Sequence, residues 1–122
     1  MFELFVVFII GGAVYGLIEL LYRGHTHWTM IIAGGICFSF LYLISTKTNW
    51  NLLVQCLAGA AFITAVEFIV GCIVNLWLRW DVWDYSEKRY NILGQVCPVF
   101  MVYWLLLCLP GILLANVISI MF

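Results

Sequence analysis

Long apolar runs with almost no charge leave this chain few possible folds. With 66% hydrophobic and only 9% charged residues, it is far from the roughly 25% charged composition of soluble domains. A helix needs about 20 mainly apolar residues to cross a bilayer. The runs allow four such spans, at about 3–22, 29–45, 52–77 and 92–109. The sequence therefore predicts an all-α integral membrane protein that forms one transmembrane domain over residues 1–122.

Residues 110–122 and the loop 79–91 complete the expected topology. Pro110-Gly111 should break or kink the last apolar run, so the tail is either a bent extension or an interfacial segment. Lys and Arg favour the cytoplasmic side, and one set of loops carries four of the five: Arg23, Arg79, Lys88 and Arg89. Loops 23–28 and 79–91 are therefore expected in the cytoplasm and both termini outside, with a bacterial plasma membrane as the expected location.

The first and third spans resemble each other. "GGAVYGLIE" (11–19) aligns with "GAAFITAVE" (59–67), and their final glutamates pair. A second match, at a different offset, pairs 32–40 with 92–100. Apolar sequence matches itself easily, so chance is an alternative explanation. A true duplication predicts two similar helical hairpins, as a parallel repeat with its axis along the membrane normal.

The glutamates within the spans are the main candidates for function. By helical spacing they share faces with small residues: Gly12, Gly16 and Glu19 in the first span, and Ala60, Thr64 and Glu67 in the third. A charge at the bilayer centre costs about 3 kcal/mol or more, so Glu67 should be protonated or paired.

Two roles are open for Glu67, proton or cation handling and a structural hydrogen bond between helices. Glu19 lies one turn before Arg23, so the two are expected to form an ion pair near the headgroups. A structural role is favoured for Glu19.

"RWDVWDYSEKRYN" (79–91) holds six of the eleven charges in the chain. Its basic and aromatic residues are those that any membrane boundary selects. Its other polar residues are expected to brace the loop over the mouth of the helix bundle, and a ligand site is the alternative. The candidates for either role are Asp81, Trp83, Asp84, Tyr85, Asn91 and Gln95.

Pro98 is expected in the middle of the fourth span. There it would remove a backbone donor and leave the carbonyl of Gly94 without a partner. The freed backbone and Gln95 could then line a cavity.

Metal, catalytic and nucleic-acid functions have little support. His25-x-His27 has no third ligand nearby, so no metal site and no cofactor are expected. The five cysteines are expected to pack as small hydrophobes. No nucleotide-binding loop, nucleic-acid signature or paired nucleophile and base is visible, so the chain is not expected to be an enzyme.

Trp83-Asp84-Tyr85-Ser86, followed by Asn91, Gly94-Gln95 and Cys97, resembles the signature of a family of small membrane proteins usually labelled putative ABC-transporter permeases. The similarity covers roughly residues 12 to 105 and includes the helix that ends in Arg23-Gly24. It implies a role in membrane transport. The loop that couples typical ABC permeases to their ATPase is absent, so the resemblance does not supply a mechanism. No soluble domain is expected in the chain, so a candidate ATPase or other membrane subunit would be a separate partner.

The leading hypothesis is a transport-related membrane protein, a permease-like subunit for a small solute or ion in which Glu67 and Glu19 handle a proton or cation. A non-transporting accessory subunit that binds lipid or a partner protein is one alternative. A small dimeric ion channel or multidrug-type exporter is another. Four spans enclose little space, so a homodimer or higher oligomer in the lipid bilayer is expected, with no nucleic-acid partner.

Overall fold

The computed structural model describes residues 2–24, 26–80 and 82–122, apart from the side chain of Arg23. The described chain forms four α-helices: α1 (Phe2–Arg23), α2 (Trp28–Lys47), α3 (Leu52–Gly71) and α4 (Pro98–Met121). A π-helical segment, η1 (Cys72–Trp77), continues α3 without a break. Each of the four is long and apolar enough to cross a membrane when α3 and η1 are taken together. The predicted all-α membrane class is confirmed.

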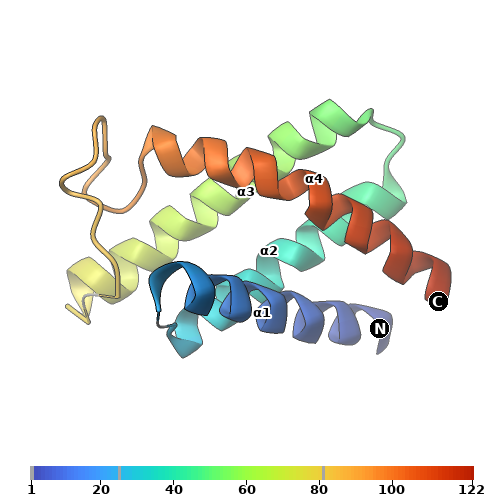
Figure 1. Ribbon diagram of the computed structural model, residues 1–122, viewed down its shortest axis with the longest axis horizontal. Helices are drawn as coiled ribbons and strands as arrows, with labels where there is room; N and C mark the ends of the chain where they lie inside the picture. The colour runs from blue at the N-terminus through green and yellow to red at the C-terminus, as the bar shows by residue number, and fades with distance from the viewer. Residues whose placement is uncertain (1, 25, 81) are drawn as a thin grey trace.

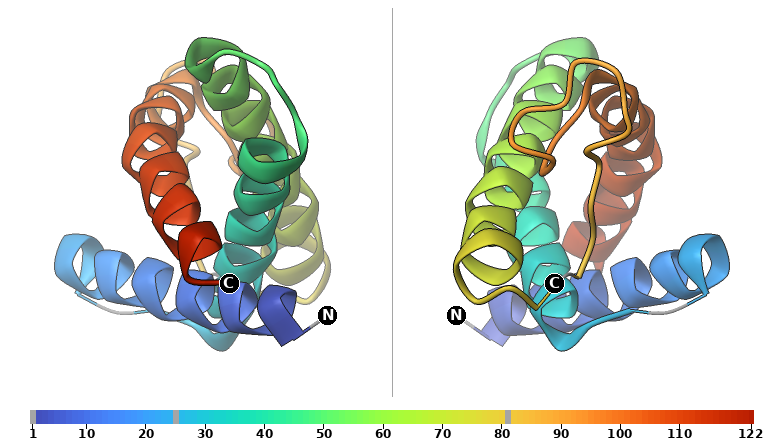
Figure 2. Two further views of the ribbon diagram at one scale, coloured as in Figure 1. Left: turned by 90° about the vertical axis from the view of Figure 1, so that its right-hand side faces the viewer. Right: turned by 90° about the vertical axis from the view of Figure 1, so that its left-hand side faces the viewer.

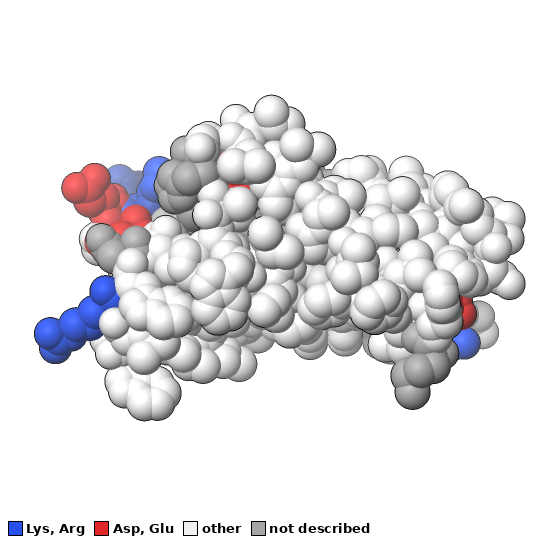
Figure 3. All heavy atoms as spheres, turned by 90° about the horizontal axis from the view of Figure 1, so that it is seen from below, with Lys and Arg blue, Asp and Glu red and all other residues white. Residues whose placement is uncertain are grey.

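The helices run back and forth along the long axis of the molecule (Figure 1). The start of α1, the end of α4 and the connection between α2 and α3 lie at one end, and the loop between η1 and α4 lies at the other. Figure 2 shows α2, α3 and α4 side by side, with α1 crossing them obliquely. Lys, Arg, Asp and Glu gather at the two ends of the molecule and leave an uncharged belt between them (Figure 3). A bilayer requires this distribution.

The predicted bounds of the fourth span were wrong. The helix begins at Pro98 rather than at residue 92, and it continues through Pro110 to Met121. Pro98 occupies the first helical position, where the missing N–H costs nothing. Leu93 and Gly94 have φ values of 54° and 74°, which a right-handed helix does not allow. The carbonyl of Gly94 accepts a hydrogen bond from the Tyr85 N–H at 2.8 Å, so it is not left without a partner by Pro98.

The tail predicted at 110–122 is therefore part of α4. Membrane helices accommodate an internal proline when neighbouring groups compensate for the lost hydrogen bond. Gly111 packs closely against α2, since a Cβ there would lie 3.1 Å from Leu41 Cδ1.

The second half of the proposed repeat pairs unlike structures. Residues 32–40 lie inside α2, whereas 92–97 form an irregular turn closed by a single bridge between Ile92 and Val96. The first half pairs two helices, and its glutamates, Glu19 and Glu67, are both buried. Duplication of the hairpin stays a prediction.

Glycines allow α1 and α2 to approach closely. A Cβ on Gly34 would lie 2.5 Å from the Cβ of Tyr15, and one on Gly12 would lie 2.9 Å from the carbonyl oxygen of Ile31. Gly12, Gly16 and Glu19 are all buried, as their spacing predicted. The small face of α1 thus packs against α2, which fixes the position of Glu19.

We expect Gly34→Ala to lower the free energy of unfolding by about 1–3 kcal/mol, because overpacking against the Cβ and ring of Tyr15 outweighs the gain in helix propensity. Chemical unfolding in detergent, followed by circular dichroism, measures this change. Gly16→Ala is the matched control, since its Cβ would lie 3.3 Å from the Ile31 side chain. Equal stability of the two variants would contradict the proposed close packing.

Candidate functional site

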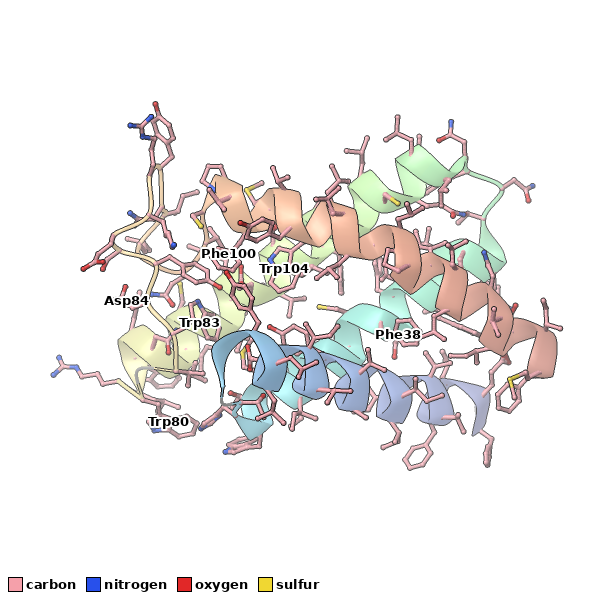
Figure 4. The ribbon with its side chains drawn as sticks, in the orientation of Figure 1. Phe38, Trp80, Trp83, Asp84, Phe100 and Trp104 are labelled. Atoms are coloured by element: carbon pink, nitrogen blue, oxygen red, sulfur yellow. The ribbon has the colours of Figure 1, made fainter. Side chains whose placement is uncertain are left out.

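Glu67 lies at the centre of the bundle and is only 4% exposed. The Tyr85 hydroxyl donates a hydrogen bond to its Oε2 at 3.3 Å. The Trp104 indole N–H donates to its Oε1, also at 3.3 Å. One donor comes from the loop between η1 and α4 and the other from α4, and Figure 4 shows Trp104 directed from α4 into the bundle. Glu67 therefore connects three parts of the chain that are far apart in sequence.

Glu19 is 6% exposed and has its own set of donors. The Tyr15 hydroxyl donates to Oε2 at 3.2 Å, and the Thr26 hydroxyl donates to Oε1 at 2.8 Å. The expected ion pair with Arg23 lies outside the described residues, because that side chain is not described. The described donors to Glu19 are thus close to it in sequence, unlike those of Glu67.

Two hollows adjoin these carboxylates. The central cavity, about 210 Å³ in volume, is lined by all four helices and is almost entirely apolar apart from Glu67. The lateral groove, about 340 Å³, lies between α1 and α4 and contains Glu19. Tyr15 and Trp104 line both hollows, and their ring centroids are 6.0 Å apart. Ile18 and Leu107 also line both hollows, so the two rings and these aliphatic side chains lie between the groove and the cavity.

Asn75 attaches the loop to the end of η1. Its Nδ2 donates to Gln95 Oε1 at 2.7 Å, and its Oδ1 accepts from the backbone N–H groups of Val82 at 2.7 Å and Trp83 at 3.4 Å. The Trp83 indole N–H donates to the carbonyl of Gln95 at 3.1 Å. Gly71 leaves room for this arrangement, since a Cβ there would lie 2.5 Å from Gln95 Oε1.

Asp84 and Asn91 organise the outer part of the same loop. Asp84 Oδ1 accepts from the Ser86 N–H at 2.9 Å, and the residue is exposed at the end of the molecule (Figure 4). Asn91 Nδ2 donates to the carbonyls of Ser86 at 3.1 Å and Lys88 at 2.9 Å. Its Oδ1 accepts from the Gly94 N–H at 2.9 Å. Both side chains therefore hold turns within the loop.

Two aromatic rings of the loop enter the mouth of the bundle. Trp83 and Tyr85 are 5% and 4% exposed. The Tyr85 ring stacks on Phe100 with a centroid distance of 4.4 Å and an interplanar angle of 8°. This stacking positions the Tyr85 hydroxyl at Glu67.

The structure brings some of the predicted site residues together. Tyr85 meets Glu67, and Trp83 meets Gln95, while Glu19 lies apart in the groove. Asp81 lies outside the described residues. Sequence reasoning missed Asn75 and Trp104 as site residues. Each had a signal: Asn75 is an amide in an apolar span, and Trp104 is a tryptophan far from the span ends.

His27 has a structural position in the fold. Its Nδ1 accepts from the Thr29 N–H at 3.3 Å, which caps α2. Its ring lies 5.6 Å from Trp28 and 5.7 Å from Trp80, measured between centroids. His25 lies outside the described residues. Within the described part of the chain, no three His, Cys, Asp or Glu side chains are placed to hold a metal ion.

Comparison with protein families gives a match over nearly the whole chain. The family described as Putative ABC-transporter type IV matches residues 4–121. No curated protein and no solved structure matches the chain.

We expect Asn75→Ala to loosen the loop over residues 78–97, because it removes hydrogen bonds to Gln95, Val82 and Trp83 and leaves buried polar groups unpaired. A loss of about 1–3 kcal/mol of local stability is typical for such a change. Amide hydrogen exchange of the loop measures it. Asn49→Ala, at an exposed position, is the control, and equal exchange in both variants would contradict the bracing role.

Proposed function

Because the chain belongs to the Putative ABC-transporter type IV family, we propose that it is a membrane transport subunit in which Glu67 handles a proton or a small cation. The observation that carries this proposal is the position of Glu67. It is a buried carboxyl group in the wall of the central cavity, held by donors from the loop and from α4. Ionisable groups at such depth in a membrane protein commonly mark ion or proton pathways.

The two donors to Glu67 suit a group that changes its protonation state. An indole N–H can only donate, so Trp104 requires an acceptor oxygen, which both a carboxylate and a carboxylic acid provide. A tyrosine hydroxyl can donate to a carboxylate or accept from a carboxylic acid. Glu67 can therefore gain or lose a proton and keep both contacts.

Thr64 adds a polar atom on the same helical face. Its Oγ1 is buried and has no hydrogen-bond partner among the described residues. It lies three positions before Glu67, which places both side chains on one side of α3. Thr64 is not among the residues that line the central cavity, so it adds a second polar group to this face of α3 without extending the cavity wall.

The wider arrangement is part of the proposal. The central cavity of about 210 Å³ is small for a solute pathway, which supports a homodimer or higher oligomer. The charged ends in Figure 3 support a membrane-spanning orientation. The four Lys and Arg residues of loops 23–28 and 79–91 support a cytoplasmic position of these loops, with both termini outside. Glu19, in the lateral groove, is the second candidate for cation handling.

An accessory role is the second candidate function. The loop is held by internal hydrogen bonds from Asn75 and Asn91, and it exposes Arg79, Glu87, Lys88 and Arg89 at one end of the molecule. A braced, charged surface of this kind would suit a separate ATPase or another membrane subunit.

We expect Glu67→Gln to abolish cation flux while the protein still folds, since the amide keeps the size of the side chain but cannot exchange a proton. The measurement uses proteoliposomes with a pH-sensitive dye inside, under imposed proton, sodium and potassium gradients. Glu3→Gln is the matched control, because Glu3 lies in the first turn of α1 and lines neither hollow.

Flux in Glu67→Gln equal to that of the wild type would contradict the proposed role of Glu67. Absence of flux in the wild type, together with stoichiometric co-purification of an ATPase, would favour the accessory role.

We expect Tyr85→Phe to reduce this flux without abolishing it. The phenyl ring keeps the stacking on Phe100, but the hydroxyl that contacts Glu67 is lost. Comparing the pH dependence of flux in the two proteins tests the link, because a shifted profile requires contact with the titrating group. An unchanged profile would contradict it.

A further inference from the structure

We propose that the lateral groove holds an acyl chain of an acidic phospholipid and that Lys88 binds the phosphate of its headgroup. The inference goes beyond the proposed function, because lipid binding at this site requires no ion transport. It is argued from the lining of the groove and from the position of Lys88 at its outer end. One bound lipid would fill an apolar hollow and neutralise a basic group of the protein.

The groove is a gap between two helices that pack on other partners. α1 packs on α2, whereas α4 packs on α2 and α3, so α1 and α4 diverge and leave the groove between them. Its surface is almost entirely apolar, and Tyr22 and Leu106 in its wall are 66% and 64% exposed. The groove therefore opens sideways, where the helices meet hydrocarbon. An acyl chain suits this hollow because it requires no polar partner there.

Glu19 does not change the apolar character of the groove. Its carboxyl group is 6% exposed. Its two oxygens accept hydrogen bonds from the hydroxyls of Tyr15 at 3.2 Å and Thr26 at 2.8 Å. A polar headgroup would gain little at this base, where the donors are already engaged. The headgroup of a bound lipid therefore belongs at the outer end of the groove, beside the charged end of the molecule.

Aromatic rings mark this outer end. Tyr22 lies in the last turn of α1, and Phe100 lies near the start of α4, at the end of the molecule that carries the loop (Figure 4). Their ring centroids are 6.4 Å apart. Tyr103 is 43% exposed, and its ring centroid lies 5.3 Å from that of Phe100. Tyrosine favours the boundary between hydrocarbon and headgroups, because its ring is apolar and its hydroxyl is polar.

Lys88 places a positive charge beside the same rings. Its Nζ lies 6.0 Å from the ring centroid of Phe100, and the residue is exposed. Its backbone is fixed in a turn, since its N–H donates to the carbonyl of Tyr85 at 2.8 Å and its carbonyl accepts from Asn91 Nδ2 at 2.9 Å. Among the described residues, no carboxyl group pairs with Lys88. A lipid phosphate at the groove would supply the missing negative charge.

The overall charge of the loop gives a different expectation from the position of Lys88. The exposed charged residues of its described part are nearly balanced in sign: Arg79, Asp84, Glu87, Lys88 and Arg89. A nearly balanced surface attracts acidic lipid only weakly. A single basic group at the mouth of an apolar groove instead predicts selectivity at one place, since its effect falls off within about 10 Å.

The test is lipid binding to the whole delipidated chain in detergent, measured by native mass spectrometry. The probes are dioleoylphosphatidylglycerol, dioleoylphosphatidylcholine and glycerol phosphate, which has the phosphate without the acyl chains. We expect one molecule of phosphatidylglycerol to bind at least about five-fold more tightly than phosphatidylcholine. Glycerol phosphate alone should not bind measurably, because it lacks the chain that occupies the groove.

Two pairs of variants separate the headgroup contact from the chain contact. Lys88→Gln should weaken phosphatidylglycerol binding about five-fold and leave phosphatidylcholine binding unchanged. Arg79→Gln is its matched control, because it removes an exposed positive charge from the same loop but lines neither hollow. Leu106→Trp fills the groove and should weaken binding of both lipids at least about five-fold. Leu113→Trp is its control, since Leu113 is 53% exposed on α4 and does not line the groove.

Four results would overturn the inference. Equal loss in Lys88→Gln and Arg79→Gln would mean that binding reflects only surface charge. Equal affinity for the two phospholipids would remove Lys88 as the phosphate ligand, and equal binding in Leu106→Trp and Leu113→Trp would remove the groove as the site. Binding of glycerol phosphate as tight as that of the lipid would make the acyl chain unnecessary. None of these results bears on flux through Glu67, and absence of flux would leave the lipid site in place.

Discussion

The carboxyl group of Glu67 imposes the strongest constraint on this molecule. Hydrocarbon offers no water to satisfy a buried polar group, so each one must find its partners within the protein. The described donors to Glu67 are Tyr85 and Trp104, which follow it by 18 and 37 residues. To supply them, the chain must place α4 beside α3 and must fold the loop between η1 and α4 back into the bundle. Asn75 and Gln95 hold the loop in that position, and Gly71 provides the space beneath it.

Hydropathy and helical spacing were enough to predict the membrane class and the faces that carry the glutamates. The first three spans lie within two residues of the expected ranges when α3 and η1 are taken together. Glu19 and Glu67 are buried beside small residues, because side chains three, four and seven positions apart share one side of a helix. The helical faces follow from local spacing, and the membrane class follows from hydropathy. Both can therefore be predicted from the sequence alone.

The features that sequence reasoning missed depend on contacts between distant segments. Residues 92–97 are apolar enough to belong to a membrane helix, yet they form an irregular turn of which residues 94–97 are buried. Hydropathy does not separate a segment buried in protein from one buried in lipid. Gly94 and Pro98 were available as signals, since glycine allows a positive φ and proline is favoured at the first position of a helix. The pairing of Trp104 with Glu67 requires the packing of α3 on α4, which spacing alone does not give.

The two carboxyl groups differ in which parts of the chain their hydrogen bonds hold in place. Glu19 is held by Tyr15 and Thr26, four and seven residues away, so its described contacts constrain only α1 and the turn after it. Glu67 is held by the loop and by α4, so a change in its charge acts on two elements outside its own helix. Tyr15 and Trp104, with centroids 6.0 Å apart, join the two systems. A continuous series of contacts thus runs from the lipid-facing groove through Glu19, this ring pair and Glu67 to Tyr85, at the charged end of the molecule. Under the proposed function, a proton or cation bound at either carboxyl group would alter the donors that hold its neighbours, and the loop would respond to that change.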